Sequence, residues 1–190
     1  RQARIVAEAC RFIEAAEEVP NLADLAARAG LSVYHFHRLF KAVAGVTPKA
    51  YALAHRRKRL RTALRGGSTV TAAMHEAGFM SSSRFHADAD SALGMTPSAF
   101  RSGGADALLR FAVGACSLGA VLVAASDKGI AAILLGDDAE TLVRELQDVF
   151  PRATLIGGDP AFEETVARVV GLVEAPGTGI DLPLDVRGTA

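Results

Sequence analysis

The sequence has few cysteines and no long hydrophobic run. Its two cysteines, Cys10 and Cys116, are too few for a disulfide framework and stand in no metal-ligand spacing. The longest uncharged apolar stretches are Gly119–Ser126 and Gly129–Gly136. Both are far shorter than the roughly 20 residues that a membrane-spanning helix needs, and the first residues do not resemble a signal peptide. We therefore expect reduced cysteines, a cytoplasmic location and no contact with a membrane.

A net charge of zero hides two halves of opposite sign. Residues 1–104 hold 15 Lys and Arg against 8 Asp and Glu, whereas residues 105–190 hold 6 against 13, and all five histidines lie in the basic half. A basic domain attracts phosphate backbones and an acidic domain is repelled by them. The charge pattern and the Ser102–Ala105 linker predict two domains, residues 1–103 and residues 104–190.

The basic half contains an internal repeat. Residues 22–51 and 70–100 both read as a helix, a Gly turn, a second helix and a Gly-x-Thr-Pro stop. The turn glycines match at an offset of 48 and the stops at an offset of 49, so the second copy has one extra residue in or just after its turn. A repeat in register at so many special positions predicts a doubled helix-turn-helix. Double-stranded DNA is the first partner to consider.

Hydrophobic periodicity predicts helices in the first half and a mixed second half. A helix over residues 2–17 precedes the repeat, and a long basic helix over residues 48–65 joins its two copies. After residue 104 the pattern changes to short β-like runs, then two amphipathic helices and a final extended segment. We predict an all-α double helix-turn-helix domain followed by a small α+β lobe. The predicted strands are residues 109–116, 121–125 and 129–135, and the extended segment is residues 180–186.

The helix after the first turn has an apolar and a basic face. Phe36, Leu39, Phe40 and Val43 follow the spacing of a buried stripe. The opposite face offers hydrogen-bond donors for base edges and phosphates, and an arginine there can discriminate guanine by about 1–3 kcal/mol. The preceding helix and Gly turn favour DNA contact over a merely solvated face. The predicted DNA-binding residues of this helix are Tyr34, His35, His37, Arg38 and Lys41.

The corresponding helix of the second copy has fewer cationic donors on its outer face. At the offset of 49, Arg38 becomes Ala87 and Lys41 becomes Asp90, and Asp90 would lie badly against a phosphate. We therefore expect the first helix to dominate specific binding. Base contacts by the second helix would rest on Ser82, Ser83, Arg84 and His86.

The joining helix concentrates five cations between His55 and Arg61. Leucines at i, i+7 and i+11 would hold the helix down and leave most of these cations free to neutralise phosphates. The alternative is that some line the joining helix or pair with carboxylates. The predicted phosphate contacts are Arg56, Arg57 and Arg59.

These features resemble the AraC family of transcription regulators, in which a long helix bridges two helix-turn-helix units. The Gly-x-Thr-Pro stops and the segment His37–Lys41 carry the resemblance. Nearly the whole chain also resembles the Ada-like family, through residues 9–18, 35–51, 129–138 and 182–190. The resemblance implies a DNA-binding regulator of the response to DNA alkylation that acts with RNA polymerase, and we expect a monomer. It also implies an RNase H-like lobe of a methylated-DNA-protein-cysteine methyltransferase module after residue 103.

The chain departs from the Ada-like family by omission. Such proteins accept alkyl groups on a zinc-bound cysteine in an N-terminal domain and on the cysteine of a Pro-Cys-His-Arg motif, and neither is present here. We expect this chain to be an internal piece of a longer protein. The chain itself is expected to have no catalytic residue, metal site or cofactor and to be inactive alone. Zinc would bind in the preceding domain. Cys10 is interpreted as a packing residue because it lies on the apolar stripe of the first helix. Cys116 is interpreted in the same way, because it falls in an apolar strand and has no cationic neighbour in sequence to lower its thiol pKa.

Two other functions stay open at this point. The chain itself could transfer alkyl groups, or it could be an AraC-type regulator whose acidic domain binds a small effector. We expect the acidic lobe to face away from DNA, so that deleting residues 105–190 would leave DNA affinity unchanged or higher.

Overall fold

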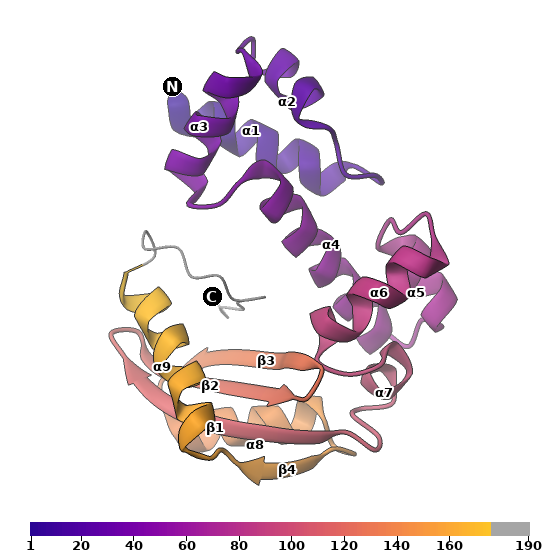
Figure 1. The fold of residues 1–190 in the computed structure, drawn as a ribbon, viewed down its shortest axis with the longest axis vertical. Coiled ribbons are helices and arrows are strands. Elements are labelled where there is room, and N and C mark those ends of the chain that lie inside the picture. Colours follow the sequence, from indigo (N-terminus) through magenta and orange to yellow (C-terminus); the bar gives the residue numbers. More distant parts are fainter. Residues whose placement is uncertain (176–190) are drawn as a thin grey trace.

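The computed structural model describes residues 1–175, apart from the side chains of Arg84 and Ala87. Within these residues, a group of helices is followed by a four-stranded sheet with a helix on each face (Figure 1). None of the described helices is long and apolar enough to cross a membrane. The helices of the first part are α1 (Gln2–Ala15), α2 (Leu22–Arg28), α3 (Val33–Ala44), α4 (Pro48–Arg65), α5 (Val70–Glu76), α6 (Ser82–Leu93) and α7 (Pro97–Arg101).

The repeated Gly-x-Thr-Pro motif is a helix stop followed by a helix start. Gly45 and Gly94 end α3 and α6 in the left-handed conformation, with φ of 77° and 68°. The next threonine caps the following helix by accepting from a backbone N–H three residues later, and the proline occupies the first turn. Asn21, Ser32 and Thr69 cap α2, α3 and α5 in the same way. The two helix-turn-helix units predicted from the repeat are therefore confirmed.

The second part is an α+β lobe built on a mixed sheet. The strand order is β3-β2-β1-β4, in which β1, β2 and β3 are antiparallel neighbours and β4 runs parallel to β1. The three predicted strands are confirmed, whereas β4 was not predicted. The predicted segment 180–186 lies outside the described residues. The elements are β1 (Leu108–Cys116), β2 (Gly119–Ser126), β3 (Gly129–Gly136), α8 (Ala139–Val149), β4 (Thr154–Gly157) and α9 (Pro160–Glu174).

The two faces of the sheet pack against different helices. Leu122 and Ala124 of β2 lie in one hydrophobic cluster with Leu142 and Leu146 of α8. Alternate residues of a strand point to opposite faces, and Val121 and its partners pack instead against α9. The apolar stripes expected on the two amphipathic helices are thus the faces that cover the sheet.

The hydrophobic cores do not follow the predicted boundary after residue 103. One core joins α1, α2 and α3 to the first part of α4, through Ala52. The larger core runs from Leu60 and Leu64 of α4, through α5, α6 and α7, into the sheet and α8. At the junction, the rings of Phe100 and Phe150 lie 5.6 Å apart, edge to face. The second helix-turn-helix unit therefore packs with the lobe as one body, and α4 connects this body to the first unit (Figure 1).

The matching glycines of the repeat have different surroundings. A Cβ atom on Gly45 would meet nothing within 4 Å, whereas a Cβ on Gly94 would lie 2.6 Å from the backbone N of Ala131. Both residues have positive φ, so only the surroundings differ. The lobe approaches the end of α6 so closely that no side chain fits between them.

Candidate nucleic-acid interface

The first recognition helix, α3, is fixed from behind by aromatic packing. Phe36 and Phe40 are fully buried, and their ring centroids lie 5.8 Å apart. Leu39 completes this buried face as predicted. Val43 was predicted to be buried too, but it is 42% exposed in the last turn of α3.

The outer face of α3 carries the predicted polar residues. Tyr34 is 72% exposed, and the Arg38 guanidinium lies over its ring at 5.6 Å from the centroid. Arg38 Nη1 is 3.5 Å from the Tyr34 hydroxyl, which is at the long limit of a hydrogen bond. His35 and Lys41 are exposed, whereas His37 is half-buried. The structure thus places four donors on an open helix face.

A glutamine from α1 joins this face, which the sequence did not predict. Gln2 lines the same surface hollow as Tyr34, His35 and Arg38. The spacing along the chain could not reveal it, because α1 lies outside the repeat. Its side-chain amide can donate to a phosphate or read an adenine edge.

The second recognition helix, α6, is held in the same way but starts differently. Phe85 is buried and its ring lies 5.1 Å from that of Phe79. The extra residue of this copy is in the turn, where exposed Met80 has no counterpart before α3. Ser81 makes no side-chain cap bond, unlike Ser32.

The predicted contacts of α6 are described only in part. Ser82, Ser83 and His86 are exposed, while the side chain of Arg84 lies outside the described part of the structure. The imidazole of His86 packs edge to face against Phe85, at 5.2 Å between centroids. Two serine hydroxyls and one imidazole therefore remain available on this helix.

Three of the five cations between His55 and Arg61 of α4 are engaged within the protein. Arg56 Nη2 donates to the carbonyl of Gly78 at 2.7 Å and the guanidinium lies over the ring of Phe79 at 4.1 Å. Arg59 Nη1 donates to the carbonyl of Ala16 at 3.1 Å. The expectation that most cations of this helix are free is wrong, because α4 is packed between the two units. Arg57 is half-buried, and phosphate contact by Arg56, Arg57 or Arg59 stays a prediction.

Arg61, from the same basic run, is buried at the junction with the lobe. Its side chain is 3% exposed and donates from Nη1 to the carbonyl of Ala131 at 2.7 Å. The second guanidinium nitrogen, Nη2, donates to the carbonyl of Ala92, and the group lies 5.7 Å from the ring centroid of Phe100. One side chain of α4 thus connects α6, α7 and β3.

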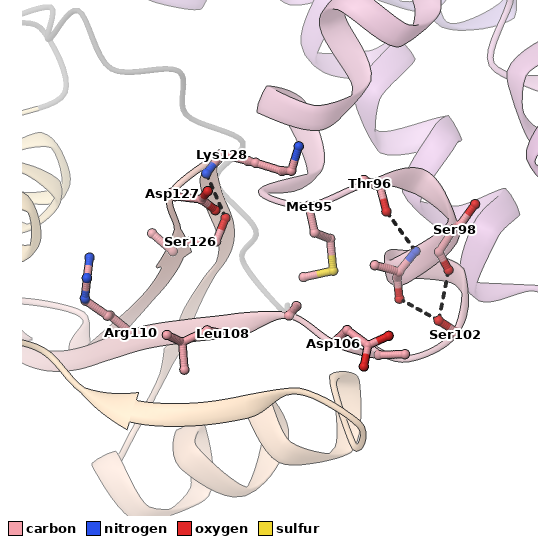
Figure 2. Close-up of a pocket in the computed structure, with 14 residues that line it drawn as sticks. Met95, Thr96, Ser98, Ser102, Asp106, Leu108, Arg110, Ser126, Asp127 and Lys128 are labelled. Carbon is pink, nitrogen blue, oxygen red and sulfur yellow. Dashed lines mark hydrogen bonds between the residues drawn. The ribbon is translucent and has the colours of Figure 1, made fainter.

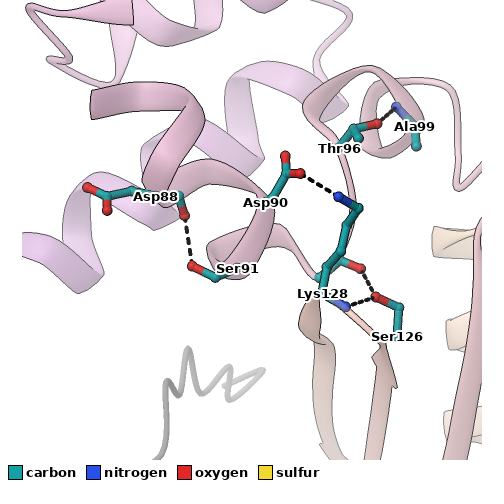
Figure 3. A network of polar contacts seen from close by, with 8 residues as sticks. Asp88, Asp90, Ser91, Thr96, Ala99, Ser126 and Lys128 are labelled. Carbon is teal, nitrogen blue, oxygen red and sulfur yellow. Dashed lines mark hydrogen bonds and ion pairs between the residues drawn. The ribbon is translucent and has the colours of Figure 1, made fainter. Parts of the chain in front are cut away.

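The lobe reaches the second recognition helix through the turn between β2 and β3. Lys128 Nζ donates to Asp90 Oδ2 of α6 at 2.6 Å, and the Ser126 hydroxyl donates to the carbonyl of Gly94 (Figure 3). The Asp90 carboxylate raises the pKa of the Lys128 ammonium group. The lobe therefore contacts the second helix-turn-helix unit directly. That the lobe faces away from DNA stays a prediction.

A cavity of about 650 Å³ lies beside this contact, between α7, β1 and the β2–β3 turn (Figure 2). Three of the polar side chains that line it are used in local contacts. Thr96 caps α7, Ser102 donates to the carbonyl of Ser98, and Lys128 donates to Asp90.

Both cysteines pack against apolar neighbours. Cys10 lies against the core of α1, α2 and α3, where burial raises the pKa of its thiol. A hydrogen bond with Tyr51 lowers that pKa in part, and the nearby Glu14 carboxylate raises it further. Cys116 packs in the core beneath α9. Among residues 1–175, no three His, Cys, Asp or Glu side chains are grouped as a metal site would require.

Comparison with known proteins covers both parts of the chain. Residues 25–103 match the family described as a helix-turn-helix domain. Over 186 residues the chain is 46% identical to the bifunctional transcriptional activator/DNA repair enzyme Ada of Escherichia coli (strain K12), and 44% identical to the regulatory protein ada of Salmonella typhimurium. The match covers 97% of this chain and 52% of each relative, so the chain spans about half their length. The chain is therefore similar to the Ada proteins over nearly its whole length, and it contains a helix-turn-helix domain.

Proposed function

We propose that this chain binds double-stranded DNA sequence-specifically, as part of a cytoplasmic regulator of transcription in the response to DNA alkylation. The carrying observation is the outer face of α3, where Tyr34, His35, Arg38 and Lys41 project from a helix fixed by buried Phe36 and Phe40. Such a helix, behind a helix-turn-helix turn, can lie in the major groove with donors toward base edges.

The similarity to the Ada relatives supports the wider role. The printed name of one relative describes a transcriptional activator and DNA repair enzyme. On this likeness, the β-sheet lobe serves as the RNase H-like part of a methyltransferase module, and the regulator contacts RNA polymerase as a monomer. The zinc site and the alkyl-accepting cysteines lie in segments that flank this one.

Arg38→Ala is expected to weaken binding to the preferred DNA sequence by roughly 10- to 100-fold, as expected for one bidentate contact to guanine. Arg84→Ala is expected to have the smaller effect, because α3 presents the richer set of donors. Affinities of both variants for a duplex selected from a random library by the unsubstituted chain test this order. Arg4→Ala is the control, since that exposed arginine pairs with Glu8 on α1. A larger loss from Arg84→Ala would contradict the dominance of α3.

Neither cysteine is expected to accept an alkyl group. Burial raises the pKa of Cys10, and the thiolate is the form of cysteine that attacks an alkyl carbon. Incubation of the chain with DNA that carries labelled methyl groups should therefore leave Cys10 and Cys116 unlabelled, as followed by mass spectrometry of their peptides. A complete Ada protein serves as the positive control. Label on either cysteine would show that this segment transfers alkyl groups itself.

A further inference from the structure

We propose that Lys128, in the turn between β2 and β3, supplies the second recognition helix with the cation that this helix lacks. The lobe would thereby belong to the DNA-binding surface rather than merely support it. This inference rests on the proposed DNA-binding function and extends it to a residue outside both helix-turn-helix units.

The repeat identifies where a cation is missing. Lys41 is the ninth residue of α3, and Asp90 is the ninth residue of α6. Asp90 follows Ser83 by seven residues, close to two turns of a helix, so the two side chains lie on the same side of α6. The first unit thus presents an ammonium group where the second presents a carboxylate.

The lobe places an ammonium group at that carboxylate. Lys128 Nζ lies 2.6 Å from Asp90 Oδ2, and the two side chains are 41% and 32% exposed. An ammonium group has three N–H donors, of which Asp90 takes one. The remaining donors can therefore bind a phosphate oxygen while the carboxylate stays neutralised.

Neighbouring bonds hold the lysine in place. The Ser126 hydroxyl donates to the carbonyl of Gly94 at the end of α6 and accepts from the backbone N–H of Lys128 at 2.9 Å (Figure 3). Arg61 fixes β3 to α6 through Ala131 and Ala92. The backbone of Lys128 is consequently held next to α6, so the side chain loses little conformational freedom when it pairs with Asp90.

Charge decides what this contact does for DNA binding. An uncompensated Asp90 would repel a phosphate approaching the outer face of α6, and the repulsion would be strongest at low salt. Pairing with Lys128 removes this repulsion. The second unit can then approach the backbone although its own sequence lacks the cation.

The test compares three variants on a duplex enriched from a random library by the unsubstituted chain. Lys128→Ala is expected to lower affinity by about five- to tenfold, the scale of one cation at a phosphate. Protection of the DNA backbone from hydroxyl radicals should weaken at the groove that α6 contacts. It should persist at the groove that α3 contacts. The double variant Asp90→Asn with Lys128→Ala should recover part of the affinity, because the repelling charge is gone while the phosphate contact of Lys128 stays lost.

Arg144→Ala is the matched control. It also removes one cation from the lobe and leaves a carboxylate, Glu140, without its partner on α8. Equal affinities for Lys128→Ala and Arg144→Ala would overturn the inference, as would a double variant no better than Lys128→Ala. Circular dichroism confirms that each variant is folded. Failure of the unsubstituted chain to enrich any duplex would instead overturn the proposed function together with this inference.

Discussion

Gly94→Ala is expected to lower the free energy of unfolding by about 3 kcal/mol more than Gly45→Ala, the same change at the matching position of the repeat. Both residues have a left-handed backbone, which costs an alanine about 1–2 kcal/mol in either unit. Only at Gly94 would the new methyl group also lie 2.6 Å from the N of Ala131 and 2.8 Å from the carbonyl oxygen of Gly129. These are backbone atoms of the lobe, so they cannot turn aside as a flexible side chain could.

Urea unfolding followed by circular dichroism measures this difference. Gly45→Ala serves as the control for backbone strain, because its Cβ would meet nothing within 4 Å. Equal losses for the two variants would mean that the lobe is not seated against the end of α6. A larger loss for Gly94→Ala supports one body formed by the second unit and the lobe.

Arg61→Ala is expected to lower the free energy of unfolding by about 3 kcal/mol, which is the scale for removing a buried charged group that satisfies buried partners. The substitution removes the donors to the carbonyls of Ala92 and Ala131 and leaves a cavity beside Phe100. Arg65→Ala is the control, since Arg65 lies over the same ring, at 5.5 Å, but is exposed. Arg65→Ala should lower the free energy of unfolding by about 1 kcal/mol or less.

Hydrogen exchange shows where the stability is lost. In Arg61→Ala, amides of α6, α7 and β3 should exchange faster, because these elements share the core that Arg61 joins. Amides of α1 and α3 lie in the other core and should keep their protection. A uniform loss over both cores would show that the chain unfolds as one unit.

Local patterns predicted most of the fold. The helix-turn-helix units follow from signals that act within a few residues, such as the glycine that ends α3 and the threonine that caps α4. The three longer strands follow from apolar runs between turn residues. Strand β4 escaped prediction because it has only four residues and none of them is buried. Its pairing with β1 depends on a partner far away in the sequence.

Of the candidate nucleic-acid interface, only the exposed face of α3 could be predicted from the sequence. The exposed donors of α3 follow from helical periodicity, and the structure shows them on one surface. The internal roles of Arg56, Arg59 and Arg61 could not be predicted, because each binds a carbonyl of a distant segment. The contact between Lys128 and Asp90 likewise joins two domains that composition alone had separated. Sequence periodicity describes one element at a time, whereas these contacts need two.

The joining helix α4 fixes more than the distance between the two units. It is one uninterrupted helix of 18 residues, held by the first core near Ala52 and by the second core near Leu60. Each residue of an α-helix adds about 1.5 Å and a rotation of about 100°. One residue gained or lost between these two points would therefore swing the second recognition helix about a quarter turn around the axis. The length of α4 therefore sets the angular phase of the two units, and on the proposed function it would select DNA sites whose helical phase matches both.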